Sequence, residues 1–174
     1  MKSSKKQPPG DKSLLLVRHA KSSWDDFSIK DFDRSLNERG KKDAPMMAKR
    51  LLKRDITIDA FISSPAKRAR KTAEAFIKEY KGSKDHIILI DELYLASPST
   101  FTEVITKTDD RFDTIAVFSH NEGITQFANN LTNTQTDNIP TSGIFAVKVK
   151  TKHWRDFADA KKEFWFFDYP KAEE

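Results

Sequence analysis

Residues 13–22 read SLLLVRHAKS, in which an apolar run passes directly into Arg18 and His19. Five consecutive small or apolar residues, 13–17, are typical of a strand that is buried on both faces. In open α/β sheets, ligands bind outside the carboxyl ends of the strands. The stretch therefore predicts a central strand with a functional site at its tip.

Length and composition indicate one globular domain. The chain has 174 residues, of which 37% are hydrophobic and 33% charged. That length is sufficient for a sizeable core. The absence of cysteine excludes disulfides and thiolate metal sites. No apolar run is long enough to cross a membrane, and the first twelve residues, MKSSKKQPPGDK, lack the apolar core of a signal peptide. These features predict a cytoplasmic protein that does not bind membranes.

The net charge of +5 is concentrated at the N-terminus. Residues 1–12 carry +3, and both signs mix along the rest of the chain. Pro8, Pro9 and Gly10 disfavour regular structure there. We therefore expect residues 1–12 to form a flexible basic tail ahead of a single domain, 13–174. The mixed charge of that domain argues against nucleic acid as a partner.

Strand-like and helix-like segments alternate along the chain. The helical periods lie around 44–52, 69–80, 98–105 and 124–131, with Ser97-Pro98 as the expected start of the third and Pro45 expected to kink the first or delay its start. The strand-like runs are 13–18, 59–63, 86–90, 114–119, 143–149 and 163–168. This alternation predicts an α/β fold, a three-layer α/β/α sandwich with a mainly parallel central sheet. The last two strands are expected to form an antiparallel edge.

Polar groups follow each of the first four predicted strands. They are Arg18-His19, then Ser63-Ser64-Pro65 with Arg68 one helical turn on, then Asp91-Glu92, and last Ser119-His120-Asn121. Arginine forks match phosphate oxygens, and a helix that begins near Pro65 would direct its N–H groups at the same anion. Histidine can act as a nucleophile or as a proton carrier. Each residue taken alone could be structural, but together they predict a site that removes phosphoryl groups.

Four motifs resemble those of the histidine phosphatase superfamily, which has the phosphoglycerate mutase-like fold. They are LLLVRHAKS, DRSLNERGKKDA, SSPAKRARKTAE and VFSHNEGI, in the family's order, and the match runs from about residue 13 to 149. The small SixA-like phosphohistidine phosphatases are the most similar branch. The resemblance implies that His19 is the nucleophile and carries a transient phosphohistidine. It implies that Arg18, Arg68 and His120 bind the phosphoryl oxygens, without a metal or cofactor.

Other positions of the expected site are less clearly defined. Asn121 and Ser22 are expected to contact substrate. Glu92 lies where many family members keep their proton donor, and the alternatives are Asp25 and Asp26. The departures from the family pattern are Ala20, Ser119 and Glu122, the last of which would place a carboxylate near the phosphate.

The short connection between the third and fourth strands bears on the substrate. Only residues 92–113 separate these strands, which predicts a small lid and an open site. An open site suits a phosphorylated protein side chain, above all phosphohistidine, or small phosphates bound broadly. The alternatives are a small-metabolite phosphomonoesterase of the same fold, a phosphate-binding module without catalysis, and a nucleic-acid-binding protein that uses the basic tail.

Overall fold

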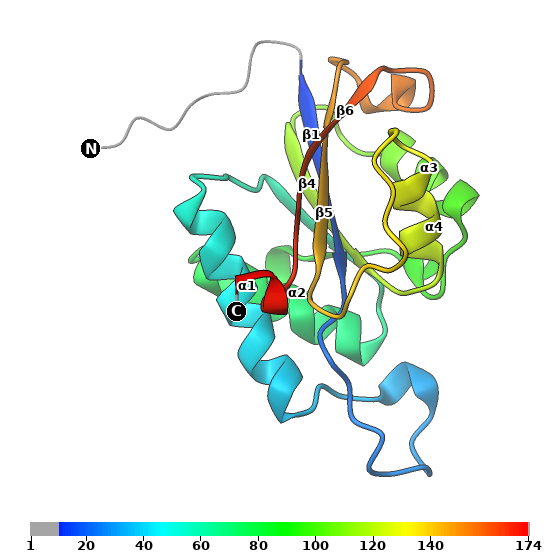
Figure 1. Cartoon of the computed structure of the whole chain (residues 1–174). Coiled ribbons are helices and arrows are strands. Elements are labelled where there is room, and N and C mark those ends of the chain that lie inside the picture. The colour runs from blue at the N-terminus through cyan, green and yellow to red at the C-terminus, as the bar shows by residue number, and fades with distance from the viewer. Residues whose placement is uncertain (1–10, 174) are drawn as a thin grey trace.

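The computed structural model describes residues 11–173, which form one six-stranded sheet with helices on both faces (Figure 1). The strand order is β3-β2-β4-β1-β5-β6. The strands are β1 (Lys12–Arg18), β2 (Ala60–Ser63), β3 (Ile88–Leu89), β4 (Thr114–Ser119), β5 (Ile144–Val149) and β6 (Lys162–Asp168).

The pairing of the strands confirms the predicted mixed sheet. β1 pairs in parallel with β4, and β2 pairs in parallel with both β4 and β3. On its other side β1 pairs antiparallel with β5, which pairs antiparallel with β6 at the edge. The four apolar residues Leu14–Val17 are fully buried because helices cover both faces of β1. The apolar run therefore marks the central strand.

Four α-helices in the described part of the chain complete the three predicted layers. They are α1 (Glu38–Lys53), α2 (Lys67–Glu79), α3 (Pro98–Thr106) and α4 (Gly123–Asn129). Leu15 and Val17 belong to the core under α1 and α2, whereas Leu14 and Leu16 belong to the core under α3 and α4. The two helix pairs lie on opposite sides of the sheet (Figure 1). No helix among residues 11–173 combines the length and the hydropathy that a bilayer span requires.

Three local expectations differ from the structure. Lys12, assigned to the tail, is the first residue of β1, where its buried stem carries the ammonium to Asp113 at 2.9 Å. Residues 1–10 of the predicted tail lie outside the described part. β3 has two residues instead of five because Lys84–His86 form a 3-10 turn. Pro45 does not delay the first helix, which begins at Glu38.

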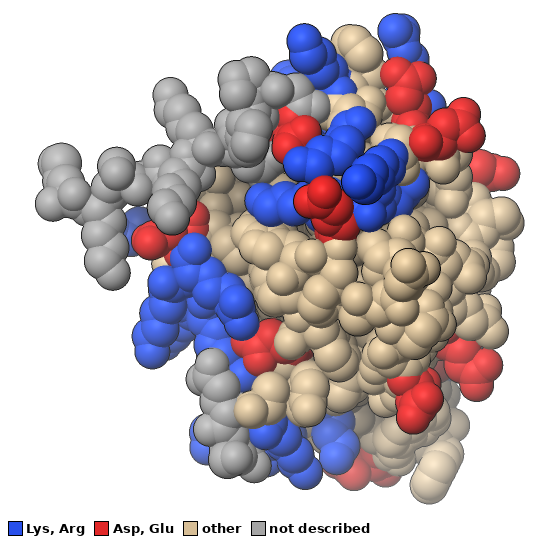
Figure 2. All heavy atoms as spheres, turned by 45° about the horizontal axis from the view of Figure 1, so that its top comes forward, with Lys and Arg blue, Asp and Glu red and all other residues tan. Residues whose placement is uncertain are grey.

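The surface around the start of β6 carries both signs of charge. Lys150 contacts Asp11 at 3.0 Å and Glu163 at 3.8 Å. Figure 2 shows this end of the molecule, where Lys and Arg side chains lie beside Asp and Glu. Neighbouring carboxylates therefore offset part of the positive charge here.

The start of α1 fixes the loop that follows β1. The Asn37 side chain accepts a hydrogen bond from the Gly40 N–H at 2.9 Å, and the Asn37 N–H donates to the Lys21 carbonyl at 3.0 Å. Gly40 packs against the same carbonyl, since a Cβ at this position would lie 2.1 Å from the Lys21 oxygen. A glycine here lets the helix approach the chain two residues after His19.

We expect Gly40→Ala to lower the free energy of unfolding by about 1–3 kcal/mol, because the backbone of the Lys21 loop must move away from the new methyl group. Urea unfolding measures this change. Lys41→Ala, one residue on at an exposed position of the same helix, should stay within about 0.5 kcal/mol of wild type. Equal stability of the two variants would contradict the packing role of Gly40.

Candidate active site

His19 follows the last residue of β1 and is buried, with 7% of its surface exposed. Its Nδ1 lies 2.7 Å from the carbonyl oxygen of Ala20. Because a carbonyl only accepts hydrogen bonds, Nδ1 carries the proton and Nε2 is unprotonated, with a lone pair that accepts a hydrogen bond from Arg68. This contact supplies the fixed acceptor that a nucleophilic histidine needs.

Arg68 lies in the first turn of α2 and faces His19. Its Nε is 3.4 Å from His19 Nε2. Its other two nitrogens donate to Asp31, to the carbonyl oxygen at 2.7 Å and to the carboxylate at 3.0 Å. Thr72, one turn further along α2, accepts a hydrogen bond from the Ala20 N–H at 2.8 Å. The first turns of α2 thus fix both the guanidinium group and the backbone beside His19.

His120 and Arg18 complete the polar floor of the site. His120 follows β4, and its ring centroid lies 5.3 Å from that of His19. Its Nε2 is 2.8 Å from the Ser64 hydroxyl at the end of β2. Arg18 donates to the Ile139 carbonyl at 2.9 Å. His120 Nδ1 and Arg18 Nε are buried and have no hydrogen-bond partner among the described residues. Buried polar atoms of this kind are usually satisfied by a ligand or water.

These side chains enclose a cationic cavity of about 340 Å³. Its volume is in the range of small-ligand pockets. Four of its lining residues are cations and none is a carboxylate, so the cavity suits a compact anion. The lining residues are Arg18, His19, Lys21, Ser22, Trp24, Arg34, Arg68, His120, Asn121 and Thr141.

The cavity brings together six of the seven residues that the sequence predicted. Ser22 and Asn121 are among them, although both side chains already have partners in the protein. The Ser22 hydroxyl accepts from Arg34 at 2.6 Å, and the Asn121 amide contacts Asn138 at 2.5 Å.

Glu92 is the predicted residue that the structure places elsewhere. It is exposed and lines a different pocket, together with Thr100 and Lys107. The chain leaves the short β3 through a 3-10 turn whose next residue, Leu93, is fully buried. Leu93 lies in the core, whereas Glu92 is exposed and does not line the cavity around His19. The expectation that the third strand end contributes its carboxylate to this cavity is therefore wrong.

The other carboxylates considered from the sequence also lie outside the cavity lining. Asp25, Asp26 and Glu122 are exposed. The Asp26 carboxylate is engaged locally, accepting from the Ser28 hydroxyl at 2.6 Å.

Asp31 and two of its partners, Tyr94 and Arg34, were not predicted. The Asp31 carboxylate accepts hydrogen bonds from Tyr94 at 2.5 Å, from Arg34 at 3.0 Å and from Arg68 at 3.0 Å. Partial burial raises its pKa, but these three donors outweigh that effect and lower the pKa to about 2. Asp31 therefore stays ionised and holds two arginines of the cavity. The surrounding KDFDRS segment has the charge density of a solvated loop, which concealed this role.

The two histidines of the cavity, His19 and His120, are neutral in the free protein at neutral pH. Burial lowers the pKa of His19 to about 3, against the hydrogen bond to Ala20, and the charges of Arg68, Arg18 and Arg34 lower it further. Burial also lowers the pKa of His120 to about 3, assisted by its proximity to His19 and Arg68. Neutral His19 is the form that can attack an electrophile.

These pKa values predict a loss of stability in mild acid. Because both pKa values are lowered in the folded state, the unfolded chain takes up protons below about pH 6.5 that the folded chain does not bind. The contribution of the two neutral histidines to the stability of the folded state is complete above about pH 6.5. It is lost as the pH falls toward their folded-state pKa values of about 3. We expect the free energy of unfolding to fall by up to about 1.4 kcal/mol per pH unit for each histidine below about pH 6.

Urea unfolding at about pH 7 and at about pH 5 measures this slope. His19→Gln should flatten it, because one of the two groups no longer titrates. His86→Gln, at an exposed position, should retain the wild-type slope. The same slope in His19→Gln and wild type would contradict the lowered pKa of His19.

Comparison with known proteins agrees with this geometry. The model of the histidine phosphatase superfamily (branch 1) matches residues 14–94. An uncharacterised protein of Mycobacterium tuberculosis is 31% identical over 150 residues, which cover 80% of this chain and 90% of that protein. A shorter match, 39% identical over 69 residues, covers 40% of this chain and 32% of an uncharacterised chloroplastic protein of Arabidopsis thaliana.

Solved structures show the same fold. A protein from Agrobacterium tumefaciens that carries the name of phosphohistidine phosphatase SixA superposes with a TM-score of 0.75 at 24% identity, covering 91% of this chain and 98% of its own. The protein histidine phosphatase SixA in complex with tungstate gives a TM-score of 0.77 at 19% identity, covering 91% and 97%. From its motifs, its fold and these matches, the chain belongs to the histidine phosphatase superfamily.

Proposed function

We propose that this protein is a phosphatase that acts through a phosphohistidine on His19, and that its substrates are phosphohistidine in proteins or small phosphates bound broadly. One observation carries the proposal. The unprotonated Nε2 of His19 faces a cavity whose charged lining residues are all cations. Such a cavity binds a phosphoryl group and places a nucleophile against its phosphorus atom.

In the first step, His19 Nε2 attacks phosphorus, an N–P bond forms, and the bond to the leaving group breaks. Arg18 and Arg68 offset the negative charge that would otherwise repel the nucleophile and that spreads over the phosphoryl oxygens in the transition state. In the second step, water attacks the phosphohistidine, and His19 and inorganic phosphate are released. His19 Nδ1–H remains bonded to Ala20 and holds the ring in position throughout.

The leaving group needs a proton, and no carboxylate lines the cavity to supply one. His120 is the second histidine of the lining and our candidate for this role, and its buried Nδ1 has no partner among residues 11–173. A bound phosphoryl dianion raises the pKa of a neighbouring histidine, which would allow His120 to donate. A weak internal acid suits a leaving group that departs readily, and the protonated imidazole of phosphohistidine is such a group. The cavity therefore favours phosphohistidine over alkyl phosphates.

The names of similar proteins support a phosphorylated protein as substrate. Three of the matching structures carry the name SixA, a phosphohistidine phosphatase. The serine/threonine-protein phosphatase Pgam5 of Drosophila ananassae is 33% identical over 84 residues, although the match spans 28% of its length. The phosphoryl site uses guanidinium groups for charge neutralisation, so we propose that turnover is independent of a metal ion.

We expect a radiolabelled aryl phosphate or phosphohistidine peptide to label wild-type protein on His19 during turnover. Alkaline quenching preserves the acid-labile N–P bond, and peptide mapping locates the label. His19→Ala should lose both label and turnover, while wild-type turnover should persist in excess chelator. Label on His120 would reverse the assignment of the nucleophile. Unchanged turnover in His19→Ala would favour a different mechanism, and metal-reversible loss in chelator would contradict metal independence.

We expect Arg68→Ala to lower kcat/KM by about 10²–10³, because it removes a donor to the transition state. Asp31→Asn should lower it by about 10-fold, since the guanidinium remains but loses the charge that orients it. Steady-state kinetics on an aryl phosphate measures both effects. Asp26→Asn, in the same loop but outside the cavity lining, is the matched control and should retain wild-type turnover. Near-normal turnover in Arg68→Ala would remove this residue from the site.

A further inference from the structure

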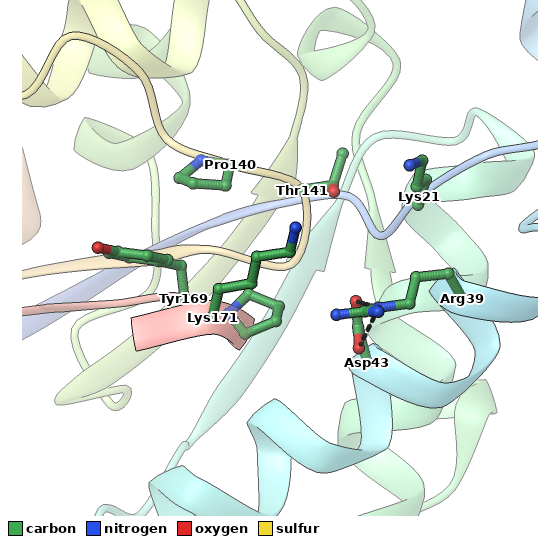
Figure 3. A pocket seen from close by; sticks show the side chains of 8 residues that line it. Lys21, Arg39, Asp43, Pro140, Thr141, Tyr169 and Lys171 are labelled. Carbon is green, nitrogen blue, oxygen red and sulfur yellow. Dashed lines mark hydrogen bonds and ion pairs between the residues drawn. The ribbon is translucent and has the colours of Figure 1, made fainter. Parts of the chain in front are cut away.

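A second cavity of about 340 Å³ adjoins the phosphoryl site (Figure 3). Lys21 and Thr141 line both cavities, so the two are neighbours across these side chains. The other lining residues are Arg39, Asp43, Pro140, Tyr169, Pro170 and Lys171. None of these six residues was expected to contact substrate from the sequence, although Arg39 and Asp43 lie within the motif DRSLNERGKKDA.

Four separate parts of the fold build this cavity, one of which is the loop after β1 that carries Lys21. Arg39 and Asp43 come from α1, Pro140 precedes β5, and Tyr169 follows β6. Arg50 of α1 donates to the Tyr169 carbonyl at 2.9 Å and to the Pro170 carbonyl at 2.8 Å, which ties the chain after β6 to the helix. The walls are therefore held in place by hydrogen bonds from within the fold.

The charge of the cavity is positive. Its one carboxylate, Asp43, is already bound by Arg39, whose Nε lies 3.0 and 3.2 Å from the two oxygens (Figure 3). Lys21 and Lys171 form no ion pair with any residue in the described range 11–173. The Lys171 side chain points toward the segment that carries Pro140 and Thr141 (Figure 3). Two lysines without an ion pair among residues 11–173 thus line a space whose other lining residues include a tyrosine and two prolines.

We propose that this second cavity is a subsite for a carboxylate of the substrate whose phosphoryl group occupies the first cavity. This inference rests on the proposed function, which places the phosphoryl group of the substrate in the first cavity. Lys171 and Lys21 would attract the carboxylate, and the apolar walls would contact the spacer that joins it to the phosphoryl group. The carboxylate could belong to a small phosphorylated acid or to an acidic side chain beside the phosphorylated residue of a polypeptide.

Non-hydrolysable phosphonates test the subsite independently of turnover. The probes are ω-phosphonoalkanoic acids of graded length, each paired with the amide of the same length, and isothermal titration measures their affinity for the full chain. We expect one length at which the acid binds about 2- to 5-fold more tightly than its amide, as for a single exposed ion pair. This preference should shrink as ionic strength rises.

Lys171→Ala should abolish the preference for the acid, and Lys171→Glu should reverse it. Because Lys171 lies outside the phosphoryl cavity, the affinity for the amide should not change in either variant. Lys152→Ala, at an exposed position between β5 and β6, is the matched control and should retain the preference. Equal affinity for acid and amide at every length, or a preference that survives in Lys171→Ala, would overturn the subsite.

Turnover then separates this proposal from the proposed function and identifies the source of the carboxylate. A phosphohistidine peptide with Glu beside the phosphorylated residue is compared with its Gln counterpart. A lower KM for the Glu peptide that is lost in Lys171→Ala assigns the carboxylate to a polypeptide. Equal KM values, with the phosphonate preference intact, assign it to a small acid. Absence of all phosphatase activity with the phosphonate preference intact would contradict the proposed function and leave the subsite standing.

Discussion

The hydrogen bond from His19 Nδ1 to the Ala20 carbonyl is the contact on which the site depends. It selects the tautomer with a lone pair on Nε2, and it directs that lone pair toward Arg68. The Ala20 backbone is itself fixed from the other side by Thr72, whose hydroxyl accepts from the Ala20 N–H and donates to the Arg68 carbonyl. The Thr72 hydroxyl on α2 thus couples the orientation of His19 to the helix that carries Arg68.

Burying a histidine among arginines is electrostatically costly only if the histidine is charged. Because both histidines are neutral, the cavity can hold four cations without adding imidazolium charge. Asp31 compensates two of these cations, Arg34 and Arg68, from outside the cavity lining. The carboxylate therefore offsets the repulsion between these arginines without occupying the space beside His19.

The sequence predicted those parts of the site that follow from backbone direction. A fully apolar strand ending in Arg18 and His19 identifies β1, and parallel pairing then places His120 on the same rim. Arg68 follows because a helix begins directly after β2. Side chains that lie in segments between the helices and strands were not predictable in this way. Asp31 reaches Arg68 from a 3-10 turn, and no hydrophobic period specifies the path of that segment.

The error at Glu92 has the same origin. Two residues of β3 and a 3-10 turn do not fix which side of the chain each residue faces, whereas the burial of Leu93 does. The contact between Gly40 and the Lys21 carbonyl shows the opposite case, in which a motif position encodes a tertiary constraint. This contact fixes the chain two residues beyond His19. The same close approach therefore also positions the backbone of Lys21, which borders both cavities. A substrate that occupies both cavities would therefore contact Lys21, whose backbone position is coupled to that of His19.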